Sequence, residues 1–153
     1  MQTFLPYLTF TRCAKCLDYK RLGKQRLECL QILRTLNGET RGWQTHPAVL
    51  MWDGYTEALV EYGVACCDEW KRRGYQDNLR DRIRTYSEGW DIEPVRPPWL
   101  THRFCLAHRS NLIRKAPDYY RPLWPNILDN LPYIWPVRIN WTIEQCALPE
   151  DFS

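Results

Sequence analysis

The fold is decided by residues 12–38, which form the stretch RCAKCLDYKRLGKQRLECLQILRTLNG. Apolar side chains recur there at the spacing of one helical face, at Leu22, Cys29, Leu33 and Leu36. This spacing predicts a helix over residues 12–36. Asn37-Gly38 then predicts its end, because glycine readily adopts the left-handed conformation that closes many helices. The longest element expected from the sequence is therefore a helix.

Proline and glycine mark the boundaries of the other expected helices. Pro47 opens a second helix over 47–73, since proline at the first helical position loses no hydrogen bond, and Gly74 ends it. Shorter helices are expected at residues 77–87 and 101–115. No strand pattern competes with them, so we expect an all-α fold.

A segment rich in proline and aromatic residues follows the last helix. Prolines exclude a regular helix or central strand from 117–136, which we expect to be an extended aromatic strap over the helical core. Residues 136–153 are expected to form a peripheral tail. The whole chain, residues 1–153, is expected to be one compact domain because its length suits a single core.

Composition excludes several classes of protein. The 153 residues are 44% apolar and 25% charged, as in globular rather than disordered chains. No apolar run approaches the roughly 20 residues of a membrane span, and the first residues lack the pattern of a signal peptide. The seven cysteines are an odd number, which favours reduced thiols in a cytoplasmic protein.

The small net charge of +3 conceals a segregated pattern. Residues 12–28 and 94–117 are basic, whereas residues 53–69 carry five carboxylates and no lysine or arginine. The charges either solvate separate helix surfaces or, where the two basic segments meet, form a face that binds a polyanion such as nucleic acid.

Arg26 falls inside the apolar arc of the first predicted helix, with Gln25 at the edge of that arc. A buried arginine needs a partner, because an unpaired charge is costly to remove from water. Two alternatives follow: an internal ion pair, or a contact with a ligand phosphate. His108 and Arg109 present a similar choice, between contacts to DNA and a structural role for the histidine.

Other motifs give no support for metal or hydrolase chemistry. Cys13 and Cys16 form a CxxC, but no second pair and no histidine pair completes a zinc site, so we interpret them as incidental thiols. The signatures of serine hydrolases, phosphate-binding loops and zinc proteases do not occur. We therefore expect no metal and no cofactor.

Five short motifs together resemble a known family. They are MQTFLPY (1–7), RLGKQRLE (21–28), HPA (46–48), HRSNL (108–112) and LPYIWP (131–136). These motifs resemble those of small bacterial relatives of the pyrimidine dimer DNA glycosylases, whose prototype is the bacteriophage endonuclease V. The resemblance implies an endonuclease V-like helical fold and a repair enzyme that acts on double-stranded DNA.

The activity implied by this resemblance uses the amine at the start of the chain. A base opposite a cyclobutane pyrimidine dimer is flipped out, and the α-amine attacks the sugar C1′. Release of the base leaves an imine, and β-elimination nicks the strand at the abasic site. An α-amine, with an ordinary pKa near 7.8, is about 14% unprotonated at pH 7, against about 0.04% for a lysine side chain.

The resemblance places catalysis at Met1, Glu28 and Arg26. Gln2 is too large for the usual removal of an initiator methionine, so we expect the Met1 amine to be the nucleophile. Glu28 is nominated as the acid and base because it is the only carboxylate in this stretch, although a helical wheel puts it on the polar face. The residues expected to contact DNA are Gln2, Thr3, Arg21, Lys24, Gln25, His46, His108, Arg109, Arg114 and Lys115.

Two alternatives to this enzyme remain open at the level of sequence. One is a non-catalytic DNA- or RNA-binding protein on the same fold, and the other is a glycosylase for a different modified base. Three aromatic residues, Tyr55, Tyr120 and Trp124, are either base-stacking or core residues. We expect a monomer without membrane contact, associated with the nucleoid in the cytoplasm of a bacterium or in a phage-infected cell.

Overall fold

The computed structural model describes residues 1–87, 89 and 94–136, and every regular element in these ranges is a helix. The helices are α1 Phe10–Cys16, α2 Tyr19–Leu36, α3 Pro47–Leu50, α4 Thr56–Arg72, α5 Arg80–Arg84, α6 His102–Lys115 and α7 Pro117–Tyr120. The prediction of an all-α fold is confirmed. The tail expected beyond residue 136 lies outside the described residues.

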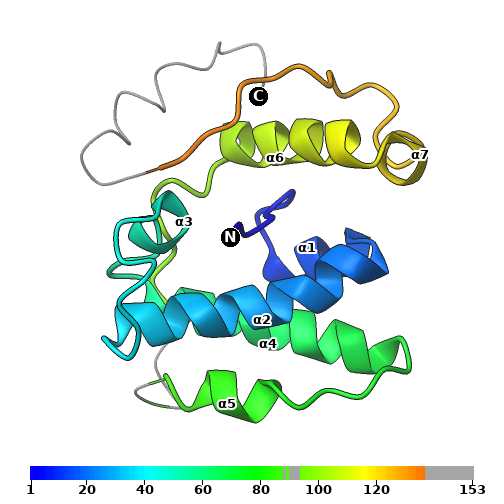
Figure 1. Ribbon diagram of the computed structural model, residues 1–153. Helices are drawn as coiled ribbons and strands as arrows, with labels where there is room; N and C mark the ends of the chain where they lie inside the picture. Colours follow the sequence, from blue (N-terminus) through cyan, green and yellow to red (C-terminus); the bar gives the residue numbers. More distant parts are fainter. Residues whose placement is uncertain (88, 90–93, 137–153) are drawn as a thin grey trace.

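The helices are stacked in levels, with the start of the chain between two of them (Figure 1). Helix α2 packs against α4, α5 lies beneath this pair, and α6 lies on the other side of α2. The N-terminal residues enter the space between α2 and α6 before the chain turns into α1. Large side chains that are fully buried fill the interior: Trp52, Tyr62, Phe104 and Tyr120.

The first predicted helix is two helices, α1 and α2. Leu17 is extended, with ψ 139°, and Asp18 caps α2 by accepting a hydrogen bond from the Arg21 N–H. Tyr120 holds this corner from a distant part of the chain, because its hydroxyl donates to the Asp18 carboxylate. The predicted end at Asn37-Gly38 is confirmed, and Gly38 has φ +78°.

The second predicted helix is also divided. Helix α3 ends at Leu50, and a turn with Gly54 at φ +87° separates it from α4. Only glycine adopts this backbone conformation without strain, so an unbroken helix over 47–73 was the wrong expectation. Helix α5 covers five residues of the expected 77–87, and α6 agrees with the expected 101–115 to within one residue.

The expected strap begins with one helical turn, α7, in which Pro117 occupies the first helical position. Its placement there corrects the expectation that 117–136 is extended throughout. Residues 121–136 contain no helix, and they pass over the outer side of α6 back toward α3 (Figure 1). None of the helices in the described part of the chain is long and apolar enough to cross a membrane.

Candidate active site

The first residues of the chain are fixed from the α2 side by Gln25. The Gln25 side chain donates to the Gln2 carbonyl at 2.8 Å and accepts from the Phe4 N–H at 2.9 Å. The Tyr62 hydroxyl lies 2.6 Å from the Phe4 carbonyl and 2.7 Å from the Gln25 amide oxygen. Gln25 is 1% exposed, so it positions the N-terminal segment and is not available to DNA as the sequence analysis expected.

Other expected DNA contacts also hold this segment in place. The Leu5 N–H donates to His108 Nδ1 at 3.0 Å, and Arg109 Nε donates to the Pro6 carbonyl at 2.7 Å. Thr3 is buried and accepts a hydrogen bond from the Trp52 indole at 3.2 Å. The expectation that Thr3 and His108 contact DNA is therefore wrong, and the structural alternative for His108 is the one observed.

His108 is uncharged in this environment. Its ring is fully buried between the rings of Phe104 and Tyr133, and burial lowers its pKa from 6.5 to about 3. Nδ1 accepts a hydrogen bond from the Leu5 N–H, so the single proton of the neutral ring is on Nε2.

Glu28 lies beside the start of the chain. Its Oε2 accepts a hydrogen bond from the Gln2 N–H at 2.6 Å, and its Oε1 is 3.7 Å from the Lys24 ammonium. Glu28 is only 6% exposed although it occupies the polar side of the helical wheel. The reason is that the N-terminal segment covers this side of α2. The wheel identified the correct side but could not show what packs on it.

His46 is a third titratable group in this region, together with the N-terminal amine and Glu28. It caps α3 by accepting the Ala48 N–H at Nδ1, at 3.0 Å, and its ring is edge-on to Trp43 and Trp135. Burial lowers the pKa of His46, the positive charge of the N-terminal amine lowers it further, and Glu28 opposes both effects. The imidazole is thus close enough to feel the charges of both groups.

Arg26 belongs to the opposite side of α2. Its Nε and Nη2 lie 2.8 and 2.6 Å from Asp77 Oδ1, and the two side chains are 8% and 2% exposed. Asp77 precedes α5 in the sequence, and α5 lies on the far side of α2 from the N-terminus (Figure 1). The guanidinium also lies over the Trp70 ring at 4.9 Å, so the internal ion pair is the alternative observed and the assignment of Arg26 to catalysis is corrected.

Gly23 explains how Trp70 reaches Arg26. A Cβ at this position would lie 2.9 Å from the Trp70 ring, which is closer than real contacts allow. The glycine in the motif RLGKQRLE therefore has a packing role.

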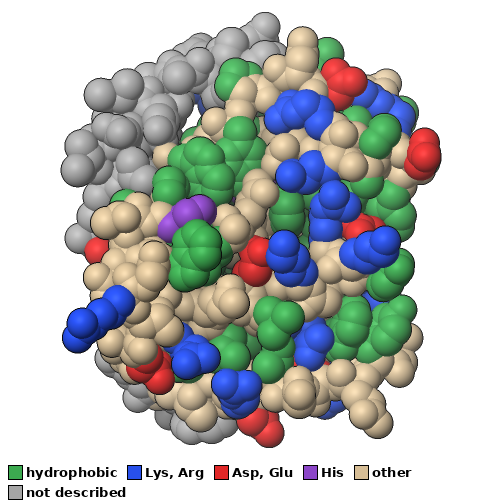
Figure 2. Space-filling model, viewed as in Figure 1, with side chains coloured by type: hydrophobic (Ala, Val, Ile, Leu, Met, Phe, Trp, Pro, Cys, Tyr) green, Lys and Arg blue, Asp and Glu red, His purple; other side chains and the backbone are tan. Residues whose placement is uncertain are grey.

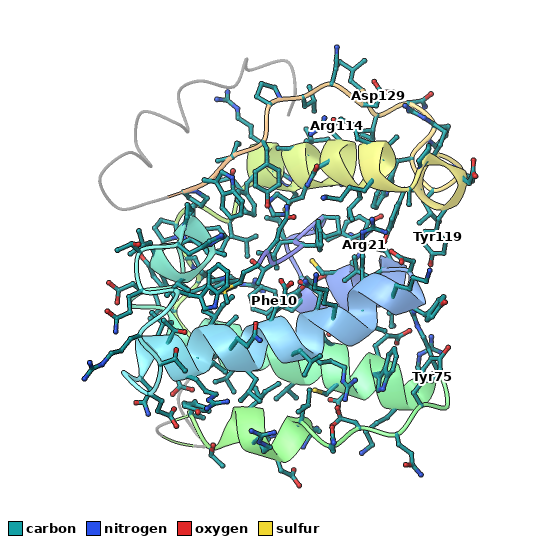
Figure 3. All side chains as sticks on the ribbon, viewed as in Figure 1. Phe10, Arg21, Tyr75, Arg114, Tyr119 and Asp129 are labelled. Carbon is teal, nitrogen blue, oxygen red and sulfur yellow. The ribbon has the colours of Figure 1, made fainter. Side chains whose placement is uncertain are left out.

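Basic side chains gather on the half of the face where α1, α2, α6 and α7 meet (Figure 2). Lys24 is 73% exposed, and Arg21, which pairs with Asp18 at 3.2 Å, lies between α2 and α6 (Figure 3). Lys115 is also exposed. Arg114 has a structural contact, because its Nη1 donates to the carbonyls of Asp129 and Leu131 in the strap (Figure 3).

The aromatic residues that contact His46 differ from those expected to stack on a base. Tyr120 and Trp124 are stacked on one another in the core, whereas Trp43 is 50% exposed beside His46. Sequence reasoning missed Trp43 and Trp135 as site residues. The only signal was the position of Trp43, three residues before His46 in a loop.

The thiols and carboxylates of the described residues do not assemble a metal site, since no group of three or more ligating side chains comes together there. Cys13 and Cys16 are free thiols, and burial raises the pKa of both, that of Cys16 to about 12. The chemistry present at the N-terminus is that of an amine, a carboxylate and a neutral imidazole.

Comparison with known proteins identifies the family. A family model described as pyrimidine dimer DNA glycosylase matches residues 1–83, which include Met1, Glu28 and His46. No curated protein and no solved structure matches the chain. Because the family model covers more than half of the 153 residues, the chain belongs to the pyrimidine dimer DNA glycosylase family of DNA repair proteins.

Proposed function

We propose that this protein is a DNA glycosylase with abasic-site lyase activity, and that the α-amine of Met1 is its nucleophile. The amine attacks C1′ of a damaged or modified pyrimidine nucleotide in double-stranded DNA, and the bond between C1′ and the base breaks. The base leaves with the bonding electrons and takes up the proton that the attacking nitrogen releases. The sugar ring then opens as O4′ leaves C1′ and takes up a proton from water, and a protonated imine joins the Met1 nitrogen to C1′.

The lyase step follows from the same imine. A base removes a proton from C2′, the C2′–H electrons form a double bond, and the phosphate on C3′ leaves, which nicks the strand. Glu28 is the carboxylate suited to this proton transfer, and its negative charge would stabilise the cationic imine. The observation that carries the proposal is the 2.6 Å hydrogen bond between Glu28 and the Gln2 N–H, one residue from the amine.

The N-terminal segment supports this role because it is rigidly held. Side chains from α2, α4 and α6 bind its backbone at Gln2, Phe4 and Leu5. An amine attached to a fixed backbone loses less freedom when it attacks, so orientation contributes to the rate. The exposed Lys24 and the neighbouring basic side chains supply affinity for phosphates.

Borohydride trapping tests the proposal. We expect the protein to form a covalent adduct with an abasic duplex in the presence of borohydride, and to nick that duplex without it. Acetylation of the N-terminal amine should abolish both products while leaving salt-dependent DNA binding intact. Binding without an adduct or a nick would overturn the enzyme and identify a non-catalytic DNA-binding protein.

A second comparison addresses the lesion. We expect the protein to release and nick at ultraviolet-irradiated duplex sites in preference to duplexes that carry a mismatch or another modified pyrimidine. Preference for one of the other duplexes would retain the amine chemistry and reject pyrimidine dimers as the substrate.

A further inference from the structure

His46 has an orientation and a proton position that are fixed by its surroundings. Pro47 has no N–H, so the Ala48 N–H is the first donor at the start of α3, and it bonds to His46 Nδ1 at 3.0 Å. A ring nitrogen that accepts a hydrogen bond carries no proton. Because burial and the N-terminal charge lower the pKa of His46, the ring is neutral and its one proton is on Nε2.

Two indole rings from distant segments hold the imidazole. Trp43 lies at 5.5 Å with an angle of 73° between the ring planes, and Trp135 lies at 5.9 Å and 87°. His46 itself is only partly buried. An uncharged donor whose ring orientation is fixed thus lies at a partly exposed position, and it is close enough to the N-terminal amine for the charge of that amine to act on it.

Among residues 1–87, 89 and 94–136, the hydrogen bond from the Ala48 N–H to Nδ1 is the one that the His46 ring makes, so its Nε2–H is available to a ligand. Nδ1 is used by the α3 cap, and Glu28 already accepts from the Gln2 N–H and lies near Lys24. Phosphates are better served by the exposed cations of α2 than by a neutral ring. When the amine approaches C1′ of a nucleotide, the ring oxygen O4′ is an acceptor bonded directly to that carbon, and it is the oxygen that must leave C1′ when the ring opens.

We propose that His46 is a substrate-contacting residue whose Nε2–H donates a hydrogen bond to the deoxyribose ring oxygen O4′ at the attacked sugar. This inference rests on the proposed function, because it places the sugar at the Met1 amine. The hydrogen bond draws electron density from O4′ and so favours opening of the ring as the imine forms. O4′ leaves C1′ with the bonding electrons and takes up a proton from water, while the imidazole keeps its own proton because Nδ1 is occupied and the ring stays neutral.

Two substitutions separate the cap from the donor. In His46→Asn the Oδ1 can still accept the Ala48 N–H, because asparagine is a good capping residue, but the donor at the Nε2 position is lost. In His46→Gln the side-chain amide N–H can reach the Nε2 position, whereas the cap is lost. We expect His46→Asn to keep the melting temperature and to slow borohydride trapping about tenfold, and His46→Gln to melt lower but to trap faster than His46→Asn.

A pair of inert duplexes tests the contact with O4′ without any amine chemistry. One carries a tetrahydrofuran abasic analogue, which has the ring oxygen, and the other carries a cyclopentane analogue, which lacks it. We expect the wild-type protein to bind the tetrahydrofuran duplex about 3- to 10-fold more tightly, the range of one hydrogen bond, and His46→Asn to bind both equally. His46→Gln should retain part of the preference.

Outcomes for the two proposals can be told apart. If the wild-type protein shows no preference for the tetrahydrofuran duplex, or if His46→Asn keeps the wild-type preference, His46 does not contact O4′, whatever the trapping result. If the preference follows the prediction but the wild-type protein gives no borohydride adduct, the sugar contact stands and the lyase function fails. Equal trapping by the wild-type protein and His46→Asn would also overturn the role of His46.

Discussion

The two sides of α2 carry buried polar residues with different partners. On the side that faces α6, Gln25 and Glu28 bind the backbone of the N-terminal segment. On the side that faces α5, Arg26 pairs with Asp77 under the ring of Trp70. Gln25, Glu28 and Arg26 all have partners, but only the first side has charged groups around a chain terminus. A buried charge is therefore not by itself a sign of a site, and here the two differ in what lies beside them: an ion pair for Arg26 and the start of the chain for Glu28.

The largest expected effect comes from breaking the Arg26–Asp77 pair. Replacement of Arg26 by Met leaves the Asp77 carboxylate buried without its cation, so we expect the free energy of unfolding to fall by about 3–5 kcal/mol in denaturant titrations. The double variant Arg26→Met/Asp77→Asn removes the buried charge and keeps an acceptor for the Arg80 N–H, and should recover part of this loss.

The same variants test the separation between the two sides. The double variant, under conditions where it is folded, should give the wild-type rate of borohydride trapping, because Arg26 does not reach the Met1 amine. A stable double variant that has lost trapping would restore Arg26 to the catalytic machinery and remove the distinction between the two sides.

Glu28→Gln, on the side of α2 that faces α6, should have the opposite profile: a small effect on stability and a large effect on the reaction rate. The glutamine can still accept the Gln2 N–H, so we expect the free energy of unfolding to change by less than about 1 kcal/mol. Loss of the carboxylate should slow single-turnover nicking of an abasic duplex about 100-fold, a typical contribution of acid–base catalysis. Glu61→Gln, the same change at an exposed position of α4, is the control and should leave the rate unaltered.

The buried His108 of α6 should make the stability of the protein depend on pH. The folded protein keeps this ring neutral until pH falls to about 3, whereas an unfolded chain binds the proton near pH 6.5. Stability is thus fully present above pH 6.5 and decreases as pH falls toward 3, by up to about 1.4 kcal/mol per unit. In His108→Asn, which can still accept the Leu5 N–H, this decrease between pH 6.5 and 5 should be smaller, as measured by denaturant titration. Equal slopes in both proteins would contradict a neutral buried His108.

The smallest effect is expected at the solvent edge of the α6 side. Lys24 is 73% exposed, so Lys24→Gln should weaken binding to duplex DNA and lower the slope of log affinity against log salt concentration by about one. Lys71→Gln, on the helix with the acidic side chains, has the same charge change and should leave that slope as it is. Equal losses in the two variants would indicate a general charge effect rather than a DNA-binding face.

The sequence predicted the helices where periodicity and end signals agree. The end of α2 at Leu36 and the span of α6 were both expected, because Asn37-Gly38 and Pro117 act locally. The break between α1 and α2 was not expected, although Asp18 caps α2 and is a local signal for a helix start. The contact of Asp18 with the Tyr120 hydroxyl, about one hundred residues away, has no local pattern that the sequence could reveal.

The candidate site was only partly predicted, because contacts between distant segments cannot be read from local sequence. Met1 and Glu28 were nominated from resemblance, and the structure brings the start of the chain next to Glu28. Thr3, Gln25, His108 and Arg109 were expected at DNA, but their polar groups bind within the protein. A helical wheel separates polar from apolar sides, yet it cannot distinguish a side that faces solvent from one that another segment of the chain covers, as the N-terminal segment does here.

The threading of the first residues between α2 and α6 has a consequence for synthesis on the ribosome. The Leu5 N–H bonds to His108, and the Pro6 carbonyl accepts from Arg109. Each of these partners is synthesised 103 residues after the residue that it binds. A nascent chain that stops before α6 therefore has the contacts of the N-terminal segment with α2 and α4 but lacks those with α6. The surroundings of this segment are complete only when most of the polypeptide already exists.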